Sequence, residues 1–168
     1  LTTKKSLANI LKNIDLKGKR FLDIGSGKGG PICYASEFGA KNCLGLEYEE
    51  ELHHRAEKNI RKLNLQDNVK SVNIDARLFK KYDEFDIYFM FNPFDDDIYE
   101  TVFNSIISQN QSIKSDKYLI AYGRANTKIL NYSDRIELFL ELQCPNRKNR
   151  ILIYQFSSQI INFILINL

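Results

Sequence analysis

The sequence predicts a doubly wound α/β fold built on a mostly parallel sheet, and three observations support this prediction. Patterns typical of strands and helices alternate from residue 20 to residue 123. Phe85–Phe91 is apolar at nearly every position, as a parallel strand buried on both faces requires. Two strand-like runs, residues 136–144 and 149–156, are joined by a connection short enough only for an antiparallel hairpin.

The elements are expected in a regular order. Apolar residues at helical spacing indicate the helices, and compact apolar runs bounded by glycine or turn residues indicate the strands. The expected strands are residues 20–24, 42–47, 69–75, 85–91, 117–123, 136–144 and 149–156, and the expected helices are residues 4–14, 31–38, 49–63 and 95–109.

Length and composition indicate a single globular domain over residues 1–168. Hydrophobic residues make up 43% of the chain, which is above the range of disordered proteins. No apolar run approaches the roughly 20 residues that a membrane-spanning helix needs, and no signal-peptide pattern opens the sequence. The three cysteines form no C-x-x-C pair, which fits a reducing compartment, so we expect a cytoplasmic protein.

The domain divides into four segments. Residues 1–19 carry an N-terminal helix, residues 20–123 the βα units and residues 136–156 the terminal hairpin. Residues 157–168 form a tail that is too short to span a bilayer and too apolar to extend freely into water. We expect the tail to pack on the sheet edge or on a second subunit, which would make a homodimer.

A glycine-rich loop follows the first strand. Its glycines, from Gly25 to Gly30, match the G-x-G-x-x-G dinucleotide fingerprint, and Glu47 follows at the distance where an acid binds ribose hydroxyls. The same loop also reads as D-x-G-x-G-x-G from Asp23 to Gly29. The acid that precedes the first glycine distinguishes between two cofactors.

Asp23 ends the first strand beside the position where a pyrophosphate would bind, and like charges at close range disfavour that ligand. A cationic ligand is favoured instead. S-Adenosylmethionine carries a positive sulfonium and amino group, and its carboxylate suits the loop amides and the start of the following helix. The residue pattern therefore favours S-adenosylmethionine over NAD.

Acidic residues end each of the first three strands. Glu47 can accept hydrogen bonds from two ribose hydroxyls, and Asp75 can accept one from an adenine amino group. Each acid taken alone could equally cap a turn or a helix. Their joint spacing after successive strands favours one pocket for a cationic nucleoside.

With these residues, the chain resembles class I S-adenosylmethionine-dependent methyltransferases from Arg20 to about Phe156. The resemblance implies a Rossmann-like seven-stranded sheet in which the terminal hairpin supplies the sixth and seventh strands. The segments that carry it are Phe21–Gly29, Gly45–Tyr48, Ile74–Ala76 and Phe91–Phe94.

The resemblance also implies which residues bind the cofactor. The methionine part would be bound by residues of the first motif, the ribose by the acid of the second, and the adenine by residues of the second and third. These residues are Asp23, Gly25, Ser26, Gly27 and Gly29 for methionine, Glu47 for ribose, and Tyr48, Asp75 and Ala76 for adenine.

Asn92, Pro93 and Phe94 are the catalytic candidates, because they follow the strand nearest to the transferable methyl group. They are similar to the Asn-Pro-Pro-aromatic motif of methyltransferases that act on amines, although the second proline is absent and Asp95 stands in place of the aromatic residue. In that chemistry the asparagine oxygen accepts amine hydrogens and so aims the nitrogen lone pair at the methyl group. A simple strand terminator is the structural alternative.

No metal site is expected. His53 and His54 lie mid-helix among glutamates, which is typical of a solvated face, and Asp95–Asp97 is best explained as a helix cap. The net charge is only +3 and the basic residues are spread over separate elements, so nucleic acid is not expected as a partner. We expect a small molecule or a protein as the methyl acceptor, and no membrane.

The sequence thus predicts an enzyme that transfers a methyl group from S-adenosylmethionine to an unidentified acceptor, with an amine suggested by Asn92. Two alternatives remain open at this point. One is a non-catalytic partner subunit that keeps the nucleoside pocket, and the other, which Asp23 disfavours, is an NAD-binding domain.

Overall fold

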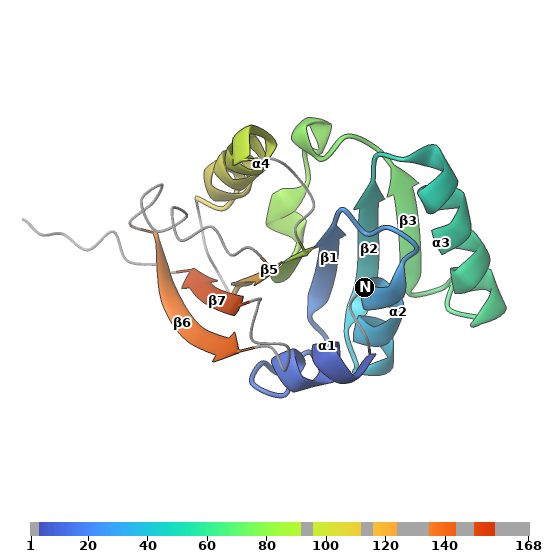
Figure 1. Ribbon diagram of the computed structural model, residues 1–168, viewed down its shortest axis with the longest axis horizontal. Helices are drawn as coiled ribbons and strands as arrows, with labels where there is room; N and C mark the ends of the chain where they lie inside the picture. Colours follow the sequence, from blue (N-terminus) through green and yellow to red (C-terminus); the bar gives the residue numbers. More distant parts are fainter. Residues whose placement is uncertain (1–3, 92–95, 112–115, 124–134, 144–149, 157–168) are drawn as a thin grey trace, which may run out of the picture.

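A computed structural model of the chain describes residues 4–91, 96–111, 116–123, 135–143 and 150–156. Strands and helices alternate along the first part of the chain, as predicted, and a pair of strands follows (Figure 1). The helices are α1 (Lys4–Leu11), α2 (Gly30–Glu37), α3 (Glu50–Lys62) and α4 (Asp96–Gln109). The strands are β1 (Arg20–Ile24), β2 (Lys41–Glu47), β3 (Val69–Asn73), β4 (Ile87–Phe91), β5 (Tyr118–Gly123), β6 (Ile136–Gln143) and β7 (Arg150–Phe156).

The strands form one seven-stranded sheet in the order β3-β2-β1-β4-β5-β7-β6. β1 to β5 pair in parallel, whereas β7 is antiparallel to both β5 and β6. The prediction of a mostly parallel sheet with a C-terminal antiparallel pair is confirmed. The strand order reverses direction at β1, between β2 and β4, which is where doubly wound sheets bind ligands.

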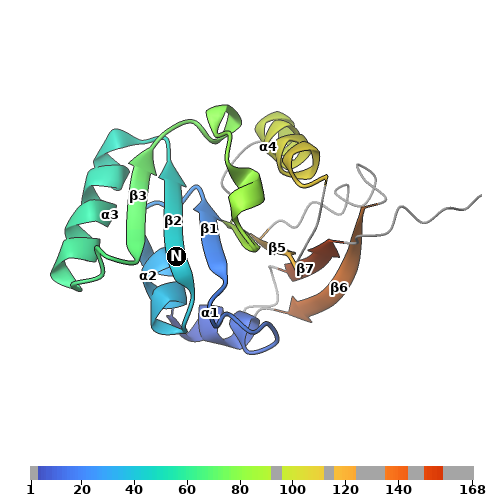
Figure 2. The ribbon, with the colours of Figure 1, turned by 180° about the vertical axis from the view of Figure 1, so that it is seen from behind.

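Two hydrophobic cores cover the two faces of the sheet. In β1, Phe21 belongs to the core shared with α1 and α2, whereas Leu22 belongs to the core shared with α4, because successive side chains of a strand point to opposite faces. Figure 2 shows α4 and the β3–β4 connection from behind. Ile87 to Met90 of β4 are all buried, as predicted for a central parallel strand.

Three predicted boundaries were wrong by two residues or more, and the others agree to within one residue. α1 ends at Leu11 rather than residue 14, because the next amides form tighter i→i−3 bonds, such as Ile14 N to Leu11 O at 3.0 Å. β4 begins at Ile87 rather than residue 85. β3 ends at Asn73 rather than residue 75, because Asp75 caps a 3₁₀ turn.

Two 3₁₀ turns, η1 (Ala76–Leu78) and η2 (Tyr82–Glu84), connect β3 to β4, and the sequence did not predict them. Buried tyrosine hydroxyls hold this connection. Tyr82 Oη donates to Ala76 O at 2.7 Å, and Tyr88 Oη lies 2.6 Å from Tyr82 O. The tyrosine hydroxyls thus donate hydrogen bonds to backbone carbonyl oxygens that, in a longer helix, would accept them from backbone amides.

In the part of the chain that the structure describes, no helix has both the length and the apolar character needed to cross a bilayer. The tail at residues 157–168 and the connection at residues 144–149 lie outside the described residues. The packing of the tail on the sheet edge or on a second subunit therefore stays a prediction.

Candidate functional site

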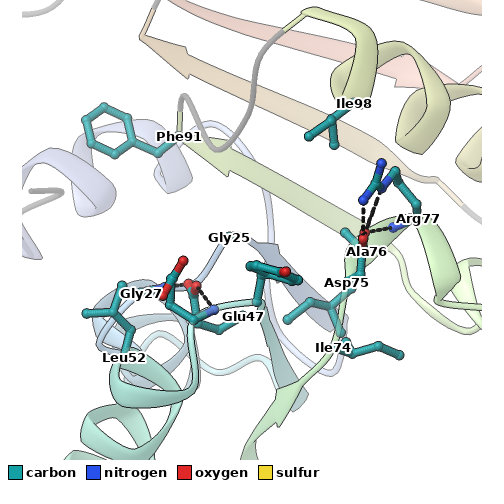
Figure 3. A pocket seen from close by; sticks show the side chains of 13 residues that line it. Gly25, Gly27, Glu47, Leu52, Ile74, Asp75, Ala76, Arg77, Phe91 and Ile98 are labelled. Carbon is teal, nitrogen blue, oxygen red and sulfur yellow. Dashed lines mark hydrogen bonds and ion pairs between the residues drawn. The ribbon is translucent and has the colours of Figure 1, made fainter.

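A cavity of about 740 Å³ opens at the carboxyl ends of the parallel strands (Figure 3). Six of the nine predicted cofactor-binding residues line it. They are Gly25, Gly27, Glu47, Tyr48, Asp75 and Ala76. The structure thus brings together residues from three separate loops at the place where the strand order reverses.

The glycine loop is fastened to the end of β2. The backbone amides of Gly25 and Ser26 both donate to Leu46 O at 2.9 Å. Gly29 has a φ of 77° and precedes α2 directly, so it turns the chain into the helix in a conformation that glycine adopts without strain. A Cβ at Gly29 would also lie 3.0 Å from Ala56 Cβ of α3, which explains why this residue lies behind the cavity rather than on its wall.

Glu47 joins the loop to the start of α3. Its Oε2 accepts a hydrogen bond from Gly27 N at 2.6 Å, and its Oε1 accepts one from Glu49 N at 2.9 Å. The side chain is 7% exposed. Each oxygen retains a second lone pair, so a carboxylate held in this way can still accept hydrogen bonds from two hydroxyls of a ligand.

Asp23 lies in β1, two residues before the loop, and is 1% exposed. Among the described residues, its Oδ2 has no hydrogen-bond partner, and neither does Ser26 Oγ. Burial raises the pKa of the Asp23 carboxyl well above its usual value, and the nearby Glu47 raises that pKa further. Asp23 and Ser26 do not line the cavity, although the sequence predicted both as ligands of the methionine part.

Asp23→Asn is expected to raise the free energy of unfolding at neutral pH. Because the pKa of Asp23 is higher in the folded state than in the unfolded state, protonated Asp23 stabilises the fold. This stabilisation is complete below the unfolded-state pKa and is lost as pH rises through the folded-state pKa. Asparagine stays neutral and avoids that loss. Urea denaturation of both proteins from pH 4 to pH 7 should show a difference that widens as pH rises. A difference that stays constant over this range would mean that burial does not raise the pKa of Asp23.

Tyr48 forms an exposed part of the cavity wall, with 68% of its surface accessible. Its backbone is held from β3, because Asn73 Nδ2 donates to Tyr48 O at 2.8 Å and to Glu47 O at 2.9 Å. An exposed ring on a fixed backbone provides an aromatic face for a planar ligand at the cavity mouth.

The Asp75 carboxylate is paired with Arg77. Asp75 Oδ1 accepts hydrogen bonds from Arg77 N at 2.9 Å and from Arg77 Nε at 3.0 Å. The side-chain hydrogen bond from Arg77 lowers the pKa of Asp75. Arg77 itself lines the cavity, and sequence reasoning missed it.

Other lining residues were also missed. Leu52 of α3 and Ile98 of α4 supply apolar surface, and their helical periodicity predicted core positions only, which is the signal that any buried residue gives. Phe91, which ends β4 at the cavity, belongs to the fourth segment of the resemblance and was predicted either for a pocket wall or for the core. The catalytic candidates Asn92, Pro93 and Phe94 lie outside the described residues.

Comparison with known proteins assigns the chain to a family. A family model described as conserved hypothetical protein 95 matches residues 2–148. A comparison with curated protein sequences gives no significant match.

Solved structures share the fold over nearly their whole length. A candidate methyltransferase, yhhF, from Escherichia coli has a TM-score of 0.74 at 19% identity, over 93% of this chain and 86% of that chain. An RNA methyltransferase from Salinibacter ruber in complex with S-adenosyl-L-homocysteine has a TM-score of 0.74 at 15% identity, over 96% and 97%. Magnesium protoporphyrin IX methyltransferase from Synechocystis PCC 6803 with bound S-adenosylhomocysteine has a TM-score of 0.69 at 14% identity, over 91% and 80%.

At these identities the structural likeness establishes the fold, and it confirms the Rossmann-like seven-stranded sheet that the sequence predicted. The family model covers most of the chain and so adds a relationship in sequence to the likeness in structure. The chain therefore belongs to the conserved hypothetical protein 95 family, and its fold is the one found in the methyltransferase structures to which it is similar.

Proposed function

We propose that this protein transfers the methyl group of S-adenosylmethionine to an amino nitrogen, and that the acceptor is RNA. The observation that carries the cofactor assignment is the Glu47 carboxylate, fixed between the glycine loop and α3 on the wall of the cavity. The two solved neighbours with S-adenosylhomocysteine, the product form of the cofactor, support the same assignment.

The cavity wall suggests how the cofactor would lie. The loop at Gly25 and Gly27 would hold the methionine part, Glu47 would accept from the ribose hydroxyls, and Tyr48 would cover one adenine face. The adenine edge would meet the Ala76 amide and Asp75. Because Arg77 already occupies the Asp75 carboxylate, adenine binding at this point competes with an existing pair.

Arg77→Ala is expected to strengthen S-adenosylmethionine binding about two- to fivefold, because loss of this exposed and therefore weak ion pair frees Asp75 for the adenine amino group. Calorimetric titration checks the affinity. Arg55→Ala, which breaks the exposed pair of Arg55 with Glu51 on α3, is the matched control and should leave the affinity unchanged. Weaker binding by Arg77→Ala would show that Arg77 itself contacts the cofactor.

Asn92, Pro93 and Phe94 are the proposed catalytic residues. Phe91, the residue before Asn92, lines the cavity. The Asn92 oxygen would accept hydrogens of the acceptor amine, so that the nitrogen lone pair points along the S–CH₃ axis. The N–C bond then forms as the C–S bond breaks, the sulfonium becomes a neutral thioether, and the new ammonium loses a proton to water.

The proposal of RNA as the acceptor departs from what the charge pattern predicts. The sequence disfavours nucleic acid because its basic residues are spread over separate elements, but the comparisons do not support that exclusion. The Salinibacter ruber protein, which is described as an RNA methyltransferase, covers nearly all of this chain and is itself nearly all covered. An exocyclic amino group of a nucleobase is an acceptor that agrees both with the similarity to an RNA methyltransferase and with the amine chemistry proposed for Asn92.

The test begins with calorimetric titration of the protein with S-adenosylmethionine, S-adenosylhomocysteine and NAD. Binding of NAD alone would overturn the cofactor assignment. Labelled S-adenosylmethionine is then incubated with total RNA or total protein, and we expect label in the RNA. Label in protein alone would overturn the choice of RNA, and cofactor binding without any transfer would favour the non-catalytic subunit. Asn92→Ala should lower turnover much more than cofactor affinity.

A further inference from the structure

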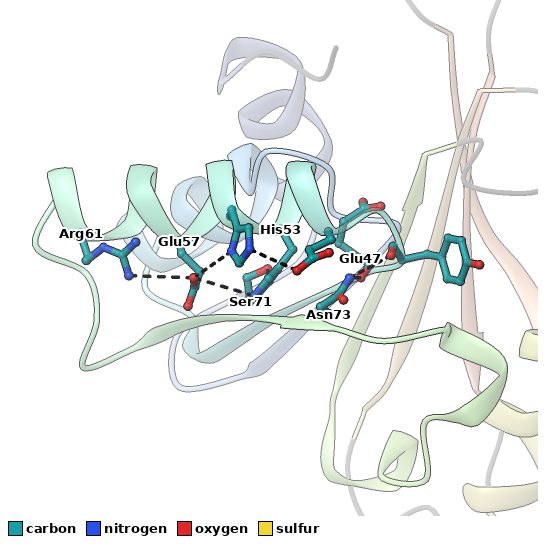
Figure 4. Close-up of polar contacts among 9 residues, drawn as sticks. Glu47, His53, Glu57, Arg61, Ser71 and Asn73 are labelled. Atoms are coloured by element: carbon teal, nitrogen blue, oxygen red, sulfur yellow. Dashed lines mark hydrogen bonds and ion pairs between the residues drawn. The ribbon is translucent and has the colours of Figure 1, made fainter.

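Two neighbouring histidines of α3, His53 and His54, lie close to Glu57 of the same helix, and Figure 4 shows His53 and Glu57 beside Ser71 of β3. His53 Nε2 lies 3.9 Å from Glu57 Oε2, and His54 Nδ1 lies 3.7 Å from the same oxygen. One ligand atom from each of the three residues lies within 4.8 Å of the other two. The spacing follows from the helix, because residues three and four positions apart are neighbours on its surface.

The other nitrogen of each imidazole also has a partner. His53 Nδ1 lies 2.9 Å from Ser71 Oγ of β3, and His54 Nε2 lies 3.5 Å from Glu50 Oε1. Histidines that bind metal nearly always donate their second ring N–H to an oxygen of this kind, which fixes the tautomer and the ring orientation. When Nδ1 of His53 and Nε2 of His54 donate in this way, the two lone pairs that remain face Glu57.

We propose that His53, His54 and Glu57 bind a zinc ion through His53 Nε2, His54 Nδ1 and a carboxylate oxygen of Glu57. Two imidazoles and one carboxylate suit a borderline ion such as Zn²⁺, whereas Mg²⁺ and Ca²⁺ prefer oxygen ligands alone. Tetrahedral zinc with bonds of about 2.0–2.1 Å holds its ligand atoms roughly 3.3 Å apart. The two separations from Glu57 therefore need to shorten by about 0.4–0.6 Å, and the separation between the two histidine nitrogens, which is at most 4.8 Å, by up to about 1.5 Å. Rotation of the exposed His54 and Glu57 side chains supplies these movements.

The surroundings leave room for a fourth ligand. A hollow of about 270 Å³ between α3 and β3 is lined by both Glu57 and Ser71. A water molecule or a small anion in this hollow would complete the coordination of the ion. Arg61 would compete with a metal ion for the Glu57 carboxylate. Its Nη1 lies 4.0 Å from Glu57 Oε2, which is too far for a strong ion pair.

The structure differs from the predicted solvated face at His53 alone, whose side chain is mostly buried, with 13% of its surface exposed. His54 lies on the solvated side of α3, as predicted, with its side chain 63% exposed. Through Ser71, a bound ion would also link α3 to β3, whose Asn73 supports the backbone of Glu47 and Tyr48. The proposal stands independently of the acceptor and of the methyl-transfer reaction.

The experiment titrates untagged, metal-free protein with Zn²⁺ in competition with a chromophoric chelator. The chain has only two histidines, so binding that depends on imidazole must come from His53 and His54. We expect one ion per chain, with affinity reduced at least tenfold in His54→Ala and in Glu57→Gln. Ser71→Ala is expected to lose about tenfold, because it removes only the partner of His53.

Glu51→Gln is the matched control. It makes the same charge change on the same helix at an exposed residue paired with Arg55, and its zinc affinity should equal that of the wild type. Co²⁺ in place of zinc should give the absorption of a tetrahedral site without thiolate bands, which excludes binding by cysteine. The proposal is overturned if the wild type binds no zinc, if both His54→Ala and Glu57→Gln keep wild-type affinity, or if the cobalt spectrum shows thiolate ligation.

Discussion

Replacing Glu47 with glutamine is expected to weaken S-adenosylmethionine binding about 10- to 100-fold. The carboxylate accepts hydrogen bonds from Gly27 N and Glu49 N and is proposed to accept from the ribose as well. Glutamine has the same shape as glutamate, but an NH₂ group replaces one of the two carboxylate oxygens. One of the two backbone amides would therefore face another donor in place of an acceptor. Hydrogen bonds to charged groups contribute about 1.5–3 kcal/mol, and about 1.4 kcal/mol corresponds to tenfold in affinity.

Calorimetric titration of the purified variant measures this loss. Glu50→Gln is the control, because Glu50 begins α3 nearby, is exposed and does not line the cavity. Thermal unfolding without cofactor shows whether the variant has kept its fold. Equal affinities of Glu47→Gln and Glu50→Gln, with both proteins folded, would remove Glu47 from the cofactor site.

Gly45→Ala is expected to lower the free energy of unfolding by about 1–3 kcal/mol, the usual cost of overpacking a filled interior. A Cβ at this position in β2 would lie 2.5 Å from Ser26 Oγ, 2.7 Å from Ser26 Cβ and 3.0 Å from Ile32 Cδ1. β2 is paired on both sides and cannot retreat, so the glycine loop would have to move. Cofactor binding should weaken together with stability.

Urea denaturation at equilibrium measures the loss. Gly30→Ala is the matched control, because a Cβ there would meet only Tyr34 Cε2, at 3.9 Å, and the residue begins a helix. Its free energy of unfolding should fall by less than that of Gly45→Ala, because the added methyl group is crowded by the adjacent Pro31 and not by the filled interior. Equal unfolding midpoints of Gly45→Ala and the wild type would show that the loop can shift without loss.

Local patterns were enough to predict much of the architecture. The uninterrupted apolar run at β4 requires burial on both faces, and the glycines after β1 require a tight turn into a helix. Because the carboxyl ends of parallel strands meet at one edge, the acids after successive strands could be assigned to one cavity from the sequence alone. Glu47 is the best example, since its position on the cavity wall follows from this rule, whereas its hydrogen bond with Gly27 of the loop was not predicted.

What the sequence did not predict depends on contacts between segments. Arg77 reaches Asp75 only because a 3₁₀ turn places the two side chains together. Burial of Asp23 behind the cavity wall depends on the packing of the loop over β1 and β2. The position of β7 between β5 and β6 could not be read from the sequence either, because both hairpin strands are rich in apolar residues.

That strand order has a consequence for how the protein is made. During synthesis the chain emerges from its N-terminus, so β6 leaves the ribosome before β7, although β7 is the strand that pairs with β5. Among the described strands, β6 pairs only with β7, so it has no place in this sheet until β7 arrives. The glycine loop and Glu47 can thus assemble early on β1 to β3, while the exposed edge of β5 stays open to wrong pairing until residue 156 has been translated. The nascent chain therefore exposes an unpaired strand edge from the synthesis of β5 until that of β7.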